Sequence, residues 1–439
     1  MRFRPFAHFT LGQPLRDECE ICFSDSTRGS AGLCKQGQET GRQKSYRELS
    51  NTFRRTIEGD RMATEAPFAD QEYLDRYQRA QALMERDGLD ALVVSEKNNY
   101  WYFSGLISYQ LDHIQRPQIC ILPKTGKPLL LVYGNDKAKA KALPWVGEVR
   151  AYTDVPFPQE MIAGCLKEMS LGESKLGFEL GDDQRLGFPV NYLSRLTEAL
   201  PKAQIKDGTA ALTEMRVIKS PQEIEFMRKA CDISMKAYDR CLPQLKPGMT
   251  RREVADRLYI SMIEEGAHPR HPGFLMLNSS TRYDDRRYNK GDRMIADFGA
   301  CYEGYYGDIT RMTIFGEPTD EHKRDHQTTC DVIQLCFESM QPGTPIAEVS
   351  RVANRELTKR GYQAVDSPKR IGHGIGMSRA EPPSLNEVET ELYRSGMVLA
   401  LEPKVRSEKS AVHLEEDLLI TDKGPEFLTT GCRDLSIVQ

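Results

Sequence analysis

The sequence predicts an α+β protein with two ordered domains, residues 66–212 and 213–439, behind a disordered extension at residues 1–61. Three observations predict this architecture. The chain has 439 residues, which exceeds the length at which a single hydrophobic core stops growing. Strand-like and helical patterns alternate in the first ordered domain, as they do in α/β proteins. In the second, long amphipathic helices are followed by groups of strands, which is typical of α+β proteins.

The composition is that of a globular protein and excludes several classes of function. Hydrophobic residues make up 39% of the chain, charged residues 28%, and the net charge is -4, so no surface for nucleic acid is expected. No run approaches the length of about 18 consecutive apolar residues that a membrane helix needs, so no membrane partner is expected. The 11 cysteines are scattered and odd in number, which favours free thiols in the reducing cytoplasm.

The first ordered domain is expected to begin after Met62, because residues 1–61 lack hydrophobic periodicity and are rich in Arg, Ser, Gly, Gln and Thr. Apolar side chains recur at helical spacing from Asp70 to Asp87, and Gly88 supplies the stop signal. Beyond this helix the patterns are strand-like at 89–95, 117–123, 128–134 and 175–180, and helical at 157–170. This alternation predicts an α/β domain.

The second domain is expected to open with a long amphipathic helix. Ser220 is a candidate N-cap, Pro221 follows at the first helical position, and Glu223 stands three residues after the cap, which is the pattern of a capping box. Thr250 is expected to cap a further helix that Gly266 ends. The patterns beyond it are strand-like at 273–278, 293–298 and 309–315 and helical at about 320–340.

Four carboxylates and one imidazole of the second domain occupy strand or turn positions where a structural role is hard to supply: Asp297, Asp308, His373, Glu402 and Glu416. An unpaired carboxylate in an apolar strand costs several kcal/mol, so each one needs a cation or hydrogen-bond donors. Oxygen-rich ligands with one nitrogen suit a pair of divalent ions such as Mn²⁺, Fe²⁺, Co²⁺ or Zn²⁺. Two such ions can hold a hydroxide nucleophile and polarise a substrate oxygen.

The order of these motifs resembles a known family. D-F-G-A-x-x-x-G-Y-x-x-D-I-T-R, then G-H-G-I-G, L-E-P and E-D ahead of an apolar strand are similar to the pita-bread metallopeptidases, which include methionine and Xaa-Pro aminopeptidases, prolidase and their creatinase relatives. "RVIKSPQEIEFMRKA" and "GLDALVVSEKNNYWYFSGL" extend the resemblance to about 70–430. It implies a pita-bread catalytic domain behind a creatinase-type α/β N-terminal domain, and a homodimer. The implied metal ligands are Asp297, Asp308, His373, Glu402 and Glu416, with Glu415 as the alternative to Glu416.

The sequence departs from the family pattern at residues that hold substrate and shuttle protons. "HGIGMSRAEPP" has Ala380 where the peptidases carry a second histidine, with Arg379 beside it. No histidine lies between His271 and His322, so Tyr283 or Arg282 is expected in the place of the upstream one. An arginine that often stands two residues before the last glutamate is replaced by Leu414.

The resemblance implies a dinuclear metallohydrolase similar to Xaa-Pro dipeptidases, in which a metal-activated hydroxide attacks a carbonyl and Glu381 or Glu402 relays the proton. Arg379 is an expected substrate contact, because a guanidinium binds a substrate carboxylate by two hydrogen bonds. Tyr283 is expected as another, because it is a candidate for the place of the upstream histidine that holds substrate in the peptidases. The alternative is a non-peptidase of the same fold, similar to creatinase, ectoine hydrolase or DMSP lyase, that acts on a small zwitterion. A binding protein that has lost catalysis is a third hypothesis, which the retained ligands disfavour.

Overall fold

The structure, a computed structural model, describes residues 66–153, 159–268, 271–280, 284–363, 370–406, 411–431 and 433–439. These residues belong to one unit, Phe53–Gln439. The predicted extension at residues 1–61 lies outside the described residues, as do Arg282 and Tyr283. In the described parts of the chain, no helix is both long enough and apolar enough to cross a membrane.

The first part of the described chain is an α/β domain around a six-stranded sheet, in the order β4-β3-β2-β1-β5-β6. The strand β1 pairs antiparallel with β2 and parallel with β5, so the sheet is mixed. The elements are α2 (Asp70–Asp87), β1 (Ala91–Val94), α3 (Lys97–Ser104), η1 (Tyr109–Asp112), β2 (Ile119–Pro123), β3 (Leu129–Tyr133), η2 (Gly134–Asp136), α4 (Lys137–Lys141), β4 (Glu148–Tyr152), α5 (Glu160–Glu168), β5 (Lys175–Phe178), α6 (Asn191–Ala199), β6 (Gln204–Asp207) and α7 (Thr209–Val217).

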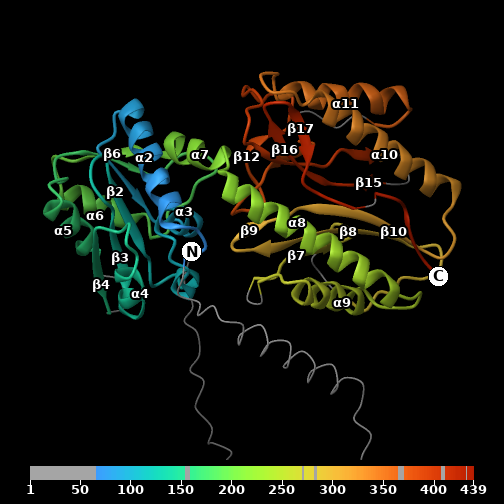
Figure 1. Ribbon diagram of the computed structural model, residues 1–439, viewed down its shortest axis with the longest axis horizontal. Helices are drawn as coiled ribbons and strands as arrows, with labels where there is room; N and C mark the ends of the chain where they lie inside the picture. The colour runs from blue at the N-terminus through green and yellow to red at the C-terminus, as the bar shows by residue number, and fades with distance from the viewer. Residues whose placement is uncertain are drawn as a thin grey trace, which may run out of the picture. The chain divides into compact units, whose positions relative to one another are not determined.

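Helices cover both faces of this sheet (Figure 1), because successive side chains of a strand point to opposite faces. Leu92 and Val94 of β1 pack in the cluster that contains α2, α3 and α7, whereas Ala91 and Val93 pack in the cluster that contains α5 and α6. The predicted helix 70–87 is confirmed, and Gly88 ends it in the left-handed region, with φ of 66°. The predicted strands at 89–95, 117–123, 128–134 and 175–180 are confirmed as β1, β2, β3 and β5.

The rest of the described chain is an α+β domain with two larger sheets and a two-stranded ribbon. One sheet has the order β18-β10-β8-β7, with β9 paired to β8, the other has the order β12-β11-β13-β16-β17, and β14 pairs with β15. The elements are α8 (Pro221–Cys241), η3 (Leu242–Gln244), α9 (Arg251–Glu264), β7 (Gly273–Leu277), β8 (Arg293–Tyr302), β9 (Tyr305–Tyr306), β10 (Ile309–Phe315), α10 (Asp320–Ser339), α11 (Ala347–Lys359), β11 (Gly372–Gly374), β12 (Glu381–Ser384), β13 (Val398–Leu401), β14 (Lys404–Arg406), β15 (Ala411–His413), β16 (Glu416–Thr421), β17 (Gly424–Phe427) and β18 (Ser436–Val438).

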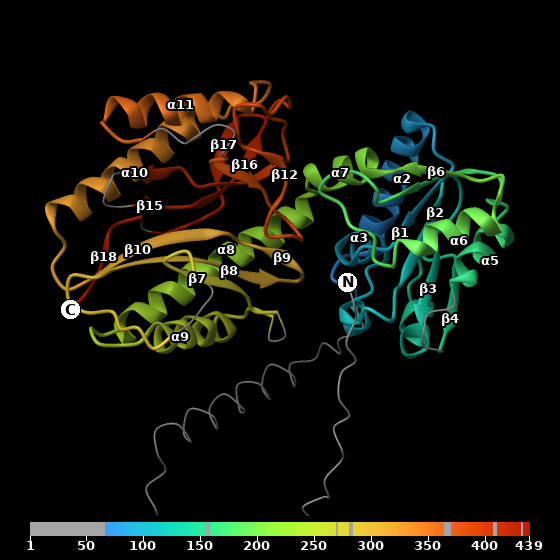
Figure 2. The same cartoon turned by 180° about the vertical axis from the view of Figure 1, so that it is seen from behind.

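The helices of this domain lie on its two outer sides, with the sheets between them (Figure 2). One hydrophobic cluster joins α8 and α9 to β7, β8 and β10, and another joins α10 and α11 to β13 and β16. The predicted capping box at the start of α8 is confirmed: Glu223 N donates to Ser220 Oγ at 3.3 Å and Ser220 N donates to Glu223 Oε2 at 2.8 Å. Thr250 caps α9 in the same way.

The β8–β10 hairpin needs glycine where its two arms meet. A Cβ on Gly299 would lie 1.7 Å from the carbonyl oxygen of Gly307, so any larger residue would push the arms apart. Both glycines stand within two residues of an aspartate, Asp297 and Asp308. The glycine-rich composition of this run therefore sets the spacing between the two acids.

Candidate metal centre

The β8–β10 hairpin delivers two buried aspartates to the space between the sheets. Asp297 lies in β8 opposite Thr310 and is 8% exposed, and Asp308 comes directly before β10 and is 3% exposed. The backbone N–H of Asp308 donates to Asp417 Oδ2 at 2.8 Å, which holds the start of β10 against β16. The two aspartates are close enough that the charge of Asp297 contributes to the raised pKa of Asp308.

The other sheet supplies a histidine and two glutamates. His373 lies in β11, Glu402 directly follows β13, and Glu415 directly precedes β16. His373 Nε2 lies 3.8 Å from Asp308 Oδ2, 4.0 Å from Glu402 Oε1 and 3.8 Å from Glu415 Oε1. We call Asp297, Asp308, His373, Glu402 and Glu415 the acidic cluster.

The tautomer of His373 suits a metal ligand. Its Nδ1 lies 3.0 Å from the carbonyl oxygen of Gly374. Since a carbonyl only accepts hydrogen bonds, Nδ1 carries the proton and the Nε2 lone pair faces the carboxylates. Burial lowers the pKa of His373, which keeps the imidazole neutral and able to bind an ion.

The electrostatics of the acidic cluster call for a cation. Burial raises the pKa of Asp308 well above its usual value, and Asp297, Asp417 and Glu402 raise it further. Burial also raises the pKa of Glu415 well above its usual value, and the charges of Asp308 and Glu402 raise that pKa further. Asp308 Oδ1 is buried and has no hydrogen-bond partner among the described residues. Four carboxylates and a neutral imidazole with an orphaned buried oxygen fit divalent ions, which such groups bind.

Two groups of potential ligands share one residue. Asp308, His373 and Glu415 form one group of donor atoms within 4.8 Å of one another, and Asp297, His413 and Glu415 form the other. Glu415 therefore belongs to both groups, and its carboxylate could help to hold an ion in either one.

The prediction of Glu416 as the last ligand is wrong in this structure, because its carboxylate faces the other side of the strand. Glu416 Oε1 lies 3.1 Å from Arg311 Nη1 and 2.8 Å from Arg433 Nε, and its side chain is 1% exposed. Side chains of neighbouring strand residues point to opposite faces. Glu415, the alternative, is the glutamate that joins the acidic cluster.

His413 belongs to one of these groups of potential ligands, and the sequence analysis did not name it as a site residue. Taking Glu416 as the last ligand placed the family's arginine position at Leu414, which is buried in the hydrophobic cluster of α10 and α11. With Glu415 as the last glutamate, the residue two before it is His413. Its Nε2 lies 3.9 Å from Asp297 Oδ2. The sequence therefore has a histidine two residues before Glu415, and taking Glu416 as the last ligand moved that position to Leu414.

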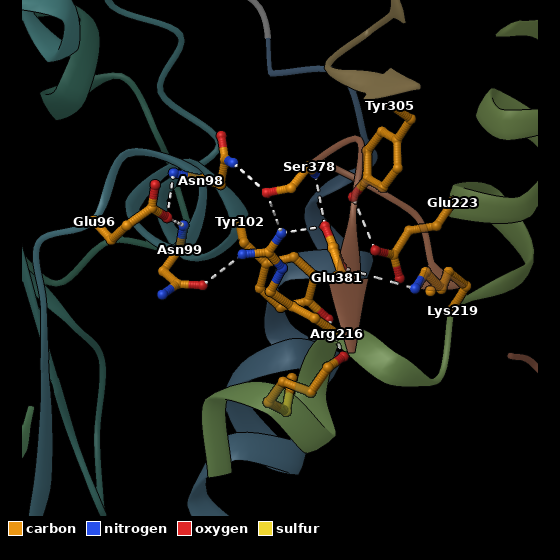
Figure 3. Close-up of polar contacts among 12 residues, drawn as sticks. Glu96, Asn98, Asn99, Tyr102, Arg216, Lys219, Glu223, Tyr305, Ser378 and Glu381 are labelled. Atoms are coloured by element: carbon orange, nitrogen blue, oxygen red, sulfur yellow. Dashed lines mark hydrogen bonds and ion pairs between the residues drawn. The ribbon is translucent and has the colours of Figure 1, made fainter. Parts of the chain in front are cut away.

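Glu381 does not stand in the acidic cluster, so the structure corrects the prediction that it serves as an acid or base there. Figure 3 shows its carboxylate between Arg216, which forms an ion pair with it, and Lys219, whose Nζ lies 3.9 Å away. Ser378 N also donates to Glu381 Oε1 at 2.7 Å. Burial raises the pKa of Glu381, but Arg216 and Lys219 outweigh it and the pKa is lowered, so the carboxylate stays ionised.

The network around Glu381 joins the α/β domain to the loop after His373. Arg216, in α7, also donates to Asn99 Oδ1 at 2.9 Å, and Asn98 Nδ2 donates to Ser378 Oγ at 2.8 Å (Figure 3). Ser378, Ala380 and Glu381 line a cavity of about 760 Å³ together with Arg216. The position where similar peptidases carry a histidine thus opens onto a cavity.

The predicted substrate contact Arg379 lies near the acidic cluster. Its guanidinium stacks over the ring of Phe274 at 4.7 Å from the centroid, and its positive charge acts to lower the pKa of both Asp308 and His373. Tyr283, the other predicted contact, lies outside the described residues. Glu402 forms an ion pair that the sequence did not predict: Lys404 Nζ lies 3.2 Å from Glu402 Oε2.

Comparison with known proteins gives two family matches. Residues 76–218 match the Creatinase/Prolidase N-terminal domain, and residues 225–422 match Metallopeptidase family M24. An uncharacterized peptidase of Staphylococcus aureus is 26% identical over 347 residues, which are 77% of this chain and 94% of the relative.

Solved structures of similar fold include peptidases from bacteria and archaea. The prolidase from Pyrococcus horikoshii OT3 is 25% identical, with a TM-score of 0.70 over 82% of this chain and 99% of that one. The Xaa-Pro dipeptidase from Bacillus anthracis is 22% identical, with a TM-score of 0.73 over 83% of this chain and 99% of that one. The second likeness concerns the fold alone.

Proposed function

Because the chain belongs to the pita-bread metallopeptidases, with an M24 catalytic domain and a creatinase-type N-terminal domain, we propose that this metallohydrolase holds two divalent ions and cleaves Xaa-Pro dipeptides. The observation that carries the proposal is the acidic cluster, where a neutral imidazole and four carboxylates meet in a buried space around an orphaned oxygen. Relatives of the same fold include a prolidase and an Xaa-Pro dipeptidase.

The acidic cluster would hold the ions, which are Mn²⁺, Fe²⁺, Co²⁺ or Zn²⁺ on the chemistry of the donors. When bound, such ions polarise a carbonyl oxygen and acidify water. In the hydrolysis, the oxygen of water bonds to the carbonyl carbon, the C–N bond breaks, and one proton of that water reaches the leaving nitrogen.

The proton transfer is assigned to Glu402. Its Oε1 faces His373, 4.0 Å from Nε2, while Oε2 lies 3.2 Å from Lys404 Nζ. Lys404 orients this second oxygen through the ion pair. The oxygen accepts a proton from the attacking water and then donates that proton to the leaving nitrogen. Glu381 takes no part, because its partners are Arg216 and Lys219.

Arg379 is assigned to the free carboxylate of the substrate. Its guanidinium lies over the ring of Phe274, with Cζ 4.7 Å from the ring centroid, and its charge acts to lower the pKa of Asp308. A planar guanidinium binds a carboxylate by two parallel hydrogen bonds, so it favours a substrate that ends close to the scissile bond, as a dipeptide does.

The test is hydrolysis of an Xaa-Pro dipeptide panel by protein loaded with Mn²⁺ or Co²⁺. We expect turnover that disappears in the metal-stripped protein and in Asp308→Ala. Arg379→Ala should raise KM for a dipeptide and leave KM unchanged for its C-terminal amide. If metal-loaded wild-type protein shows no more turnover than the metal-stripped control, the proposed peptidase activity is wrong.

A second candidate is a non-peptidase reaction on a small zwitterion, and Ala380 favours it. The histidine that shuttles protons in similar peptidases is absent there, and the side chain lines a cavity of about 760 Å³ instead. Loss of such a group typically costs about 10²- to 10⁴-fold in rate. Small amides, amidines and sulfonium zwitterions assayed beside the dipeptides would decide between the two, since only one class should be turned over efficiently.

A further inference from the structure

His413 places a second imidazole at the acidic cluster. It is the last residue of β15 and is 8% exposed, and its Nε2 has no hydrogen-bond partner among the described residues. A buried imidazole nitrogen without a partner costs free energy unless something binds it. One ring nitrogen of His413 and one carboxylate oxygen each of Asp297 and Glu415 lie within 4.8 Å of one another.

The spacing between His413 and its neighbour repeats that of the other imidazole. His413 Nε2 lies 3.9 Å from Asp297 Oδ2, and His373 Nε2 lies 3.8 Å from Asp308 Oδ2. Both separations are too long for a hydrogen bond, which spans about 2.7–3.2 Å. Both fit two atoms bound to one ion, because ligands about 2.0–2.2 Å from a metal lie at most about 4.4 Å apart.

The strand places His413 on the same side as Glu415. Residues two apart in an extended chain face the same way, and Leu414 between them is buried in the hydrophobic cluster of α10 and α11. On the neighbouring strand β14, Lys404 stands opposite His413, and Lys404 contacts Glu402. The β14–β15 ribbon therefore presents a side chain from each of its strands to the acidic cluster.

We propose that His413 is a sixth metal ligand, which holds one ion together with Asp297 and Glu415 while His373, Asp308 and Glu415 hold the other. Each ion then has an imidazole nitrogen and the two share Glu415. The inference rests on the proposed dinuclear centre. It predicts that the ion at Asp297 is a borderline one such as Co²⁺ or Zn²⁺ in preference to Mn²⁺, since imidazole suits these ions and oxygen donors suit Mn²⁺.

The experiment titrates Co²⁺ into metal-stripped wild-type protein, His413→Ala and the size-matched His413→Gln, and follows binding by calorimetry and X-ray absorption. His326→Gln is the control, since His326 is a buried histidine of α10, 7% exposed, outside both ligand groups. We expect wild type and His326→Gln to bind two ions. Both His413 variants should keep one ion and bind the second at least about 10-fold more weakly.

X-ray absorption should find two imidazoles per pair of Co²⁺ ions in wild type and one in the His413 variants, and added imidazole should restore the second ion in His413→Ala. If both His413 variants bind two ions with wild-type affinity and show the wild-type imidazole signal, His413 is not a ligand and the dinuclear centre stands. If wild type binds fewer than two ions, the proposed centre fails, and this inference fails with it.

Discussion

Thr310 and Glu415 join the two sheets at the acidic cluster. Their backbones exchange two hydrogen bonds of 3.3 Å, and the Thr310 hydroxyl donates to Glu415 Oε2 at 3.0 Å. Since Glu415 Oε1 faces His373 at 3.8 Å, the hydroxyl fixes the rotation of the carboxylate that both ligand groups share. A residue that orients a ligand in this way affects metal affinity without touching the ion.

We therefore expect Thr310→Val to weaken metal binding by about 10- to 100-fold, because the branched side chain fills the same space without the hydroxyl. Thr310→Ser keeps the donor and should bind metal as wild type does. Calorimetric titration of Mn²⁺ into both stripped variants checks this. Equal affinities in the two variants would contradict the role of the hydroxyl.

Glu415→Gln and Glu416→Gln should separate metal binding from stability. Glu415→Gln should lose bound metal, measured by elemental analysis of the purified protein. Glu416→Gln should keep its metal but lower the free energy of unfolding by about 3 kcal/mol, because it leaves the buried guanidinium of Arg311 without its full counter-charge. The reverse outcome would restore Glu416 as the ligand.

Removal of metal should lower the melting temperature, because Asp308 and Glu415 then face the charges of the other carboxylates in a buried space. Adding Mn²⁺ back at about 100 times its Kd should raise the free energy of unfolding by about 2.7 kcal/mol. Asp308→Asn removes one charge, so its metal-free form should melt at or above metal-free wild type and respond little to Mn²⁺. Differential scanning calorimetry on both proteins provides the comparison.

The ion pair between Arg216 and Glu381 should stabilise the junction of the two domains. Both side chains are largely buried, so Arg216→Met or Glu381→Gln alone should cost about 3–5 kcal/mol of unfolding free energy. The double variant should cost less than the sum, because neither charge is left unpaired. Arg150→Met, at an exposed pair with Glu168, is the control and should change little. Additive losses in denaturant titrations would argue against the pair.

Glu179 should make stability depend on pH. Burial raises its pKa to about 7, although Ser95, Asn99 and the Glu96 backbone donate hydrogen bonds to it and lower it. The folded state then binds a proton that the unfolded state, with a pKa of about 4.3, releases. The stability from this group is therefore fully present below about pH 4.3 and is lost as the pH rises through about 7.

The measurement is the free energy of unfolding of wild type and Glu179→Gln at several pH values. Between pH 5 and pH 8, wild type should lose about 2 to 3 kcal/mol of unfolding free energy relative to Glu179→Gln. Parallel curves for the two proteins would show that Glu179 does not titrate in this range.

Much of the fold was predictable because it depends on local patterns. The capping box of Ser220 and Glu223, the helix stop at Gly88 and the buried apolar run of β1 all depend on a few neighbouring residues, and all are confirmed. The extension at 1–61 and the role of Tyr283 stay predictions, as do the domain boundaries, the homodimer and the cytoplasmic location.

The acidic cluster was predictable in part. Asp297, Asp308, His373 and Glu402 were named from their contexts, and the structure brings them together as their motifs implied. Whether they bind metal stays a proposal. Glu381 was misassigned because its partners, Arg216 and Lys219, lie 165 and 162 residues earlier in the chain and no local pattern links them to it.

By itself the sequence determined the two-part architecture, the glycine-dependent hairpin and the residue types that need a cation. Only the tertiary structure decided between Glu415 and Glu416 and revealed His413. In "HLEED" the choice depends on which face of the chain meets the opposite sheet, and a shift of one residue reverses it. That face is set by the pairing of Thr310 with Glu415, a contact between residues 105 positions apart, which no local pattern records.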